Sequence, residues 1–155
     1  MSGDNTDRIE KTVVLRAPRS RVWRAIASPD EFGAWFGVKL EGEFAPSRKI
    51  EGRMTIRGFD ELKLELKVEK MEAEHTFSFR WNPYAVEKDV DYSSEEPTLV
   101  EFSLSEIASR TLLRVTESGF DRVPLARRAK AFEMNDQGWA AQLKRIDEYL
   151  AHAPA

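Results

Sequence analysis

The chain has 155 residues, which fits one domain with one sizeable core. Its formal net charge of −3 offers no overall basic surface for nucleic acid and disfavours non-specific binding to anionic membranes. It contains no cysteine, which excludes disulfides, cysteine nucleophiles and thiolate metal sites and fits a cytoplasmic location. No apolar run approaches the roughly 20 residues of a membrane-spanning helix. We expect residues 1–7 to form a disordered tail and residues 8–152 to form a single domain.

The expected domain begins with a strand and two short helices. Residues 8–16 alternate between apolar and polar side chains, which predicts a strand. Apolar residues at helical spacing predict a helix over 19–27. Ser28 then offers an N-cap for a second short helix over about 30–36, which ends before Gly37.

These two helices carry four large aromatic residues, which we interpret as packing residues rather than as a reactive site. Trp23 is expected in the core. Trp35 and Phe36 are expected beside a cavity wall, with Phe32 in the same junction.

Between residues 38 and 118 the apolar residues recur with a period of two, which predicts about six further strands. The segment 61–70 is the clearest, and similar alternation covers 75–81, 99–107 and 110–118, with weaker strands near 38–44 and 49–57. Sequential strands of this kind pair antiparallel, so we expect a sheet of about seven strands. Its apolar face must be covered by another element.

A long amphipathic helix over about 122–151 supplies that cover. It is expected to start at an Asp121 cap and to bury a stripe made of Trp139, Leu143, Ile146 and Leu150, and a break near 134–138 is left open. Gly138 costs this helix ~1 kcal/mol relative to alanine, which indicates a close backbone approach or an open volume. A twisted sheet wrapped around a long helix leaves a cavity between them, and concave apolar spaces bind small ligands.

Four segments of the chain resemble the SRPBCC superfamily, whose helix-grip fold is shared by START lipid-transfer domains and birch-pollen-allergen-like proteins. They are VVLRAPRSRVWRAIASPDEFGAWFG, FSFRW, ESGF and GWAAQLKRIDEYL. Within the superfamily the chain resembles the group related to the C-terminal domain of the activator of heat-shock-protein-90 ATPase, over roughly residues 8–151. The resemblance implies an α+β helix-grip fold, a curved antiparallel sheet around a long C-terminal helix with two short helices after strand one.

The same resemblance transfers neither a ligand nor catalytic residues. The second hairpin of the family often carries two glycines, whereas this chain has only Gly52, and the loop 82–98 is particular to this sequence. Both features border the expected cavity mouth. The family has no universal catalytic residues, so the catalytic set is unknown.

Several polar groups could carry chemistry, and for each a simpler interpretation is favoured. His75 could anchor a ligand or act as a general base, but a solvated histidine at a strand end is favoured because no partner stands at fixed spacing. The acidic segment 89–96 lacks an EF-hand register, so a solvated loop is favoured over calcium binding. Tyr84 and Tyr92 could form a lid over the cavity.

The sequence does not settle which side of the sheet the polar strand residues face, because a shift of one residue in register reverses the faces. A buried carboxylate among them would have a raised pKa and could serve in acid–base chemistry. The residues concerned are Arg53, Glu65, Arg80 and Glu117.

We therefore rank three functions. The first is a domain that binds a small apolar or lipid-like ligand in the cavity, the second a protein-interaction module of co-chaperone type that activates a chaperone ATPase, and the third a cyclase- or hydrolase-like enzyme. We expect no cofactor, no metal, no nucleic acid and no membrane span, and a homodimer through a sheet edge is left open. The expected cavity residues are Trp35, Phe36, His75, Phe77, Phe79, Trp81, Phe102, Glu117, Phe132, Gly138 and Trp139.

Overall fold

A computed structural model of the chain describes residues 6–56, 58, 62–87 and 90–152. The expected tail over 1–7 therefore lies mostly outside the described residues. Its last residue, Asp7, accepts hydrogen bonds from the backbone N–H groups of Gly119 and Asp121.

In the described part of the chain, seven strands form one antiparallel sheet in the order β1-β7-β6-β5-β4-β3-β2. The first strand pairs with the last, and all other neighbours are consecutive along the chain, as predicted. The strands are β1 (Arg8–Leu15), β2 (Val38–Glu41), β3 (Lys49–Met54), β4 (Lys63–Glu72), β5 (Thr76–Trp81), β6 (Thr98–Ile107) and β7 (Arg110–Ser118).

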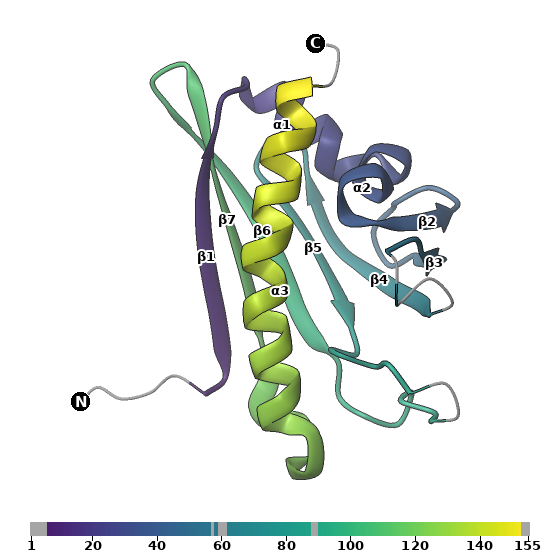
Figure 1. Cartoon of the computed structure of the whole chain (residues 1–155). Helices are drawn as coiled ribbons and strands as arrows, with labels where there is room; N and C mark the ends of the chain where they lie inside the picture. The colour runs from purple at the N-terminus through teal and green to yellow at the C-terminus, as the bar shows by residue number, and fades with distance from the viewer. Residues whose placement is uncertain (1–5, 57, 59–61, 88–89, 153–155) are drawn as a thin grey trace, which may run out of the picture.

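The helices lie on one side of this sheet. The long helix α3 (Leu125–His152) runs across the sheet, and α1 (Arg19–Ala27) and α2 (Pro29–Phe36) lie near its C-terminal end (Figure 1). A 3-10 turn, Phe120–Arg122, connects β7 to α3. This arrangement is the α+β helix-grip fold that the sequence predicts.

Local chemistry explains where the helices begin and end. The Ser28 hydroxyl accepts from the backbone N–H of Glu31 at the start of α2, and Gly37 ends that helix with φ of 92°, which glycine adopts without strain. The break near 134–138 that the sequence left open does not occur, because α3 is one continuous helix of 28 residues. One internal glycine costs a helix little when an apolar face is buried along its length.

The cap of α3 also differs from the expectation. Asp121 lies in the 3-10 turn, where its carboxylate accepts from the Thr6 hydroxyl at 2.8 Å. The Pro124 carbonyl instead accepts the backbone N–H groups of Arg127 and Arg128. Proline can begin a helix in this way because its own missing N–H would have no partner there.

The core centres on Phe32 of α2, which is fully buried. Its ring contacts five others at centroid distances of 4.9–6.4 Å, those of Trp35, Phe36, Phe44, Phe79 and Phe102. Trp35 is buried and donates its indole N–H to the Ala25 carbonyl at 2.9 Å. Trp23, expected in the core, is only half-buried and packs against the buried core from outside.

Candidate functional site

A fully buried carboxylate, that of Glu117, lies under the long helix. Strand β7 alternates between faces, so Leu113, Val115 and Glu117 share the inner face of the sheet. In the register, Glu117 stands opposite Val100 on β6 and Ile9 on β1, both buried apolar residues. The side chain of Glu117 is 0% exposed, which is rare for an acidic residue.

Four side chains from three elements donate hydrogen bonds to this carboxylate. Trp139 donates its indole N–H to Oε1 at 2.8 Å, and Trp81 donates its own to Oε2 at 2.7 Å. The Thr98 hydroxyl donates to Oε2 at 2.6 Å. The Asn135 amide nitrogen contacts Oε1 at 2.9 Å and Oε2 at 3.2 Å. The carboxylate therefore ties β5, β6 and β7 to α3.

The Glu117 site contains donors but no cation. None of the ion pairs found among the described residues involves Glu117. Burial raises the pKa of Glu117, because the charged form loses water, while the hydrogen bonds from Thr98, Trp81, Trp139 and Asn135 act in the opposite direction. A buried carboxylate with every oxygen engaged is suited to holding its neighbours in place.

An open cleft of about 1610 Å³ adjoins this site. Side chains alternate across β4, so Leu64 and Leu66 lie on the inner face and Glu65 and Lys67 on the outer face, and all four border the cleft. The apolar space under α3 is therefore only part of that volume. Apolar residues that line the cleft include Phe36, Met54, Leu64, Trp81, Met134 and Gly138.

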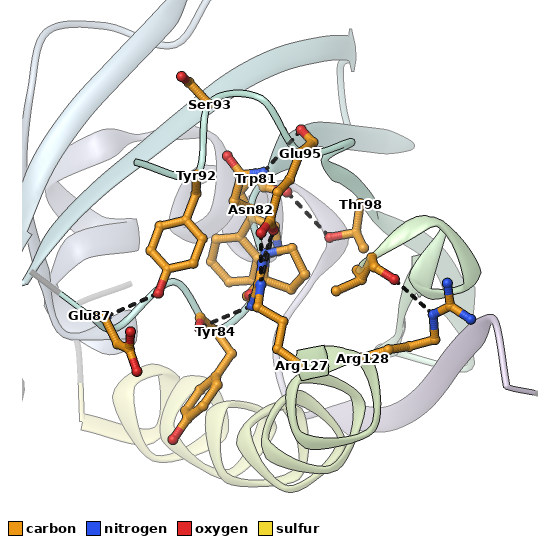
Figure 2. A network of polar contacts seen from close by, with 12 residues as sticks. Trp81, Asn82, Tyr84, Glu87, Tyr92, Ser93, Glu95, Thr98, Arg127 and Arg128 are labelled. Carbon is orange, nitrogen blue, oxygen red and sulfur yellow. Dashed lines mark hydrogen bonds and ion pairs between the residues drawn. The ribbon is translucent and has the colours of Figure 1, made fainter. Parts of the chain in front are cut away.

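The described parts of the loop between β5 and β6, residues 82–87 and 90–97, border the cleft, and Arg127 attaches this loop to the start of α3. The Arg127 guanidinium contacts the Glu95 carboxylate at 2.6 Å (Figure 2). It also donates to the Pro83 carbonyl at 2.7 Å. It also lies over the Tyr92 ring at 4.8 Å. Arg127 is thus largely buried, with its side chain 19% exposed.

The structure separates the predicted cavity residues into groups. Phe36, Trp81, Gly138 and Trp139 line the cleft, and Glu117 lies directly behind two of them. Trp35 and three strand phenylalanines belong to the buried core and do not border the cleft: Phe77, Phe79 and Phe102. Phe132 is half-buried and packs on Phe120, and His75 lies exposed in the turn between β4 and β5.

Of the four polar strand residues whose face the sequence left open, only Glu117 is buried on the inner face. Arg80 pairs with Glu69 at 2.7 Å, Glu65 pairs with Lys63 at 3.3 Å, and Arg53 is exposed. Asn135, Thr98 and Arg127 were missed by sequence reasoning, because each finds its partner far away along the chain. The signal in the sequence that could have indicated the site is an acid on an apolar strand, Glu117, together with tryptophans whose indole N–H groups could donate to it.

Among the described residues, no group of three or more histidine, aspartate or glutamate side chains could hold a metal ion. Glu95 of the acidic segment is engaged by Arg127, and Asp91 accepts from the backbone N–H of Ser93 at 2.9 Å. No helix in the part of the chain that is described has the length and apolarity to cross a membrane.

The family of the chain follows from comparison with known proteins. A family model described as "Activator of Hsp90 ATPase homolog 1-like protein" matches residues 16–151. The chain belongs to this AHSA1-like family. The match covers α1 to α3 and therefore the whole Glu117 site, in agreement with the SRPBCC-type resemblance of the sequence.

Solved structures share the fold of this AHSA1-like chain at low identity. An Arthrobacter aurescens protein has a TM-score of 0.77 and 16% identity, covering 97% of this chain and 91% of its own. The Aha1 dimer from Colwellia psychrerythraea has a TM-score of 0.71 and 18% identity, covering 96% and 98%. DynU16, a protein of the dynemicin biosynthetic locus, has a TM-score of 0.70 and 23% identity over 94% of this chain, which spans only 48% of DynU16. No curated protein matches the chain.

Proposed function

We propose that this AHSA1-like domain binds a small apolar molecule in the cleft between the sheet and α3. The observation that carries the proposal is the open apolar wall at Gly138. A Cβ atom built on Gly138 would meet nothing within 4 Å, although the residue lies in the middle of α3 and borders the cleft. Half-buried apolar side chains, among them Met54, Leu64 and Met134, face the same space.

The Glu117 site supports this function by holding two walls of the cleft. Trp81 and Trp139 come from the sheet and from α3, and one carboxylate orients both indoles. Pre-organised walls reduce the ordering cost that binding would otherwise incur. Because the Glu117 oxygens are already occupied by protein donors, we assign Glu117 a positioning role and propose no catalytic step.

A pair of substitutions at Gly138 tests the proposal. Gly138→Trp places a large ring in the open space, whereas Gly138→Ala adds only one methyl group there. Decanol serves as the apolar probe, and its binding is followed by thermal shift and by titration calorimetry. We expect binding to wild type and to Gly138→Ala, and its loss in Gly138→Trp. Equal binding by all three folded proteins would place the ligand elsewhere and reject the cleft.

A second candidate function is activation of a chaperone ATPase, which the family match over residues 16–151 favours. Shared family and fold carry this function only by analogy. The ATPase rate of the cognate Hsp90-type chaperone, measured with and without the domain, tests it. No change in rate together with no detectable complex would reject it. A cytoplasmic location is proposed with either function.

The open edge of the sheet is our candidate surface for the homodimer that the sequence left open. In the described part of the chain, β1 pairs only with β7, so its other side offers backbone groups to a second strand. Light scattering after size exclusion decides between monomer and dimer. A monomer at high protein concentration would reject the dimer.

A further inference from the structure

The three tyrosines of the chain differ in what their hydroxyl groups bind. The Tyr149 hydroxyl donates to the Glu31 carboxylate at 2.8 Å, and the Tyr92 hydroxyl accepts from the backbone N–H of Glu87 at 3.2 Å (Figure 2). The Tyr84 hydroxyl has no hydrogen-bond partner among the residues that the structure describes. Its oxygen is not one of the fully buried polar atoms that lack a partner, so a molecule from outside can reach it.

Tyr84 lies at the cleft in a partly sheltered position. The residue is half-buried, packs against the hydrophobic core and borders the cleft together with Trp81 and Met134. Figure 2 shows that its ring extends away from Glu95 and Tyr92. A hydrogen bond beside apolar groups is stronger than one in open water, because the local dielectric is lower. The Tyr84 hydroxyl is therefore placed where a bound molecule would gain from it.

The backbone at Tyr84 adopts a conformation that is rare for a bulky residue. Its φ is 50°, in the left-handed region, which disfavours side chains other than glycine, asparagine and aspartate. Residues held in such sparsely populated regions cluster at sites that contact ligands. Arg127 holds this conformation, because its guanidinium donates to the carbonyl of Pro83 at 2.7 Å and to that of Tyr84 at 3.3 Å. The segment that carries the ring is thus fixed from α3.

Other polar side chains border the same cleft, and they fall into two groups. The amide nitrogens of Asn82, Asn135 and Gln142 already bind carbonyl or carboxylate oxygens of the protein. A second group is exposed at the rim, where water competes for its hydrogen bonds: Lys49, Arg53, Lys63, Lys67, Ser93 and Gln137. Tyr84 belongs to neither group, since its hydroxyl is a half-buried donor that no protein group uses.

We propose, resting on the ligand-binding function above, that Tyr84 is a specificity-determining residue of the cleft and donates its hydroxyl hydrogen to an oxygen of the bound molecule. The ligand class that fits is an apolar molecule with an acceptor oxygen, such as a ketone, an ester or an alcohol. Its apolar part occupies the open space beside Gly138, and its oxygen lies at Tyr84.

Two probes with the same chain length test the inference on the full chain by titration calorimetry. 2-Octanone carries an acceptor oxygen, whereas 1-chlorooctane lacks a strong acceptor. Tyr84→Phe removes the hydroxyl and keeps the ring. One net neutral hydrogen bond corresponds to a factor of about threefold to tenfold in affinity. We expect Tyr84→Phe to lower the affinity for 2-octanone by that factor and to leave the affinity for 1-chlorooctane within about twofold of wild type.

Tyr149→Phe is the matched control, because it removes the same atom from a tyrosine that does not border the cleft. The variant takes a hydrogen bond from Glu31, so its melting temperature should fall. Both probes should still bind it within about twofold of wild type. A change in affinity that merely follows stability would appear in this control as well as in Tyr84→Phe.

The outcomes separate this inference from the proposed function. A loss of 2-octanone affinity in Tyr84→Phe alone, with 1-chlorooctane unaffected, supports the inference. Equal binding of 2-octanone by wild type and Tyr84→Phe overturns it, and so does an equal loss for both probes or an equal loss in Tyr149→Phe. Decanol binding that is sensitive to Gly138→Trp, combined with any of these results, overturns the inference alone. No binding of decanol or of either probe to wild type overturns both.

Discussion

Trp81 on β5 and Trp139 on α3 donate their indole N–H groups to opposite oxygens of one carboxylate, that of Glu117, at 2.7 and 2.8 Å. Their rings lie 5.8 Å apart and are inclined by 31°. Sheet and helix are thus joined at the cleft by one buried acid.

Glu117→Gln should destabilise the domain by about 1–3 kcal/mol, although the two side chains have nearly the same shape. Glutamine has one oxygen, so its NH₂ group must face the N–H of one indole. The Thr98 hydroxyl can turn to the Trp81 carbonyl, 3.4 Å away, but an indole N–H cannot become an acceptor. Urea unfolding measures the change. Glu148→Gln at an exposed site is the control and should stay within about 0.5 kcal/mol of wild type.

The stability difference between wild type and Glu117→Gln should shrink as pH rises. Burial raises the pKa of Glu117 in the folded chain, so the folded state holds the proton more tightly than the unfolded state does. The stabilisation that Glu117 contributes is fully present below its pKa in the unfolded chain. It is lost as pH rises through its raised pKa in the folded chain. Urea unfolding from about pH 4 to about pH 8 tests this. If the stability difference between wild type and Glu117→Gln grew with pH, the four hydrogen-bond donors would lower the pKa of Glu117 by more than burial raises it.

The contact between Arg127 and Glu95 should contribute a coupling energy of about 1–2 kcal/mol, because both side chains are largely buried and the hydrogen bonds are charge-assisted. A double-mutant cycle with Arg127→Met and Glu95→Gln measures it by urea unfolding. Hydrogen exchange of the amides over 82–87 and 90–97 should accelerate in each variant. A coupling near zero with unchanged exchange would mean that other contacts hold this loop.

Gly138→Ala should stabilise the chain by about 0.5–1 kcal/mol, because alanine favours the helix and its methyl group meets open space. Gly52→Ala is the opposite case. There a Cβ atom would clash with the Lys39 carbonyl oxygen, so the paired strands would have to separate. The melting temperature should therefore rise in Gly138→Ala and fall in Gly52→Ala. A lower melting temperature in Gly138→Ala would contradict the open space beside Gly138.

Trp35→Ala should cost about 3–5 kcal/mol, the range for a fully buried aromatic residue, and should also leave the Ala25 carbonyl without its donor. Trp23→Ala should cost clearly less, since Trp23 is half-buried. The two variants also form a matched pair, because both residues lie in the first two helices. Equal losses in urea unfolding would mean that Trp23 contributes to the core as strongly as Trp35.

Much of the fold could be predicted because it depends on local periodicity. The alternation in β4 and β7 and the stripe at Trp139, Leu143 and Ile146 place these segments in a sheet and a covering helix. The unbroken α3 could not be predicted, since tertiary burial outweighs the local cost of Gly138. The half-burial of Trp23 depends likewise on neighbours that the sequence does not reveal.

The candidate site also combines features that the sequence shows with features that only the tertiary structure decides. The sequence alone determined that an acid at position 117 stood among apolar alternating residues and that indoles were available at 81 and 139. The tertiary structure alone decided that Glu117 points inward and that Asn135 and Thr98 complete its shell. The reason is physical: a shift of one residue in strand register reverses the face of every side chain, and hydrogen bonds between distant segments leave no periodic signal in the chain.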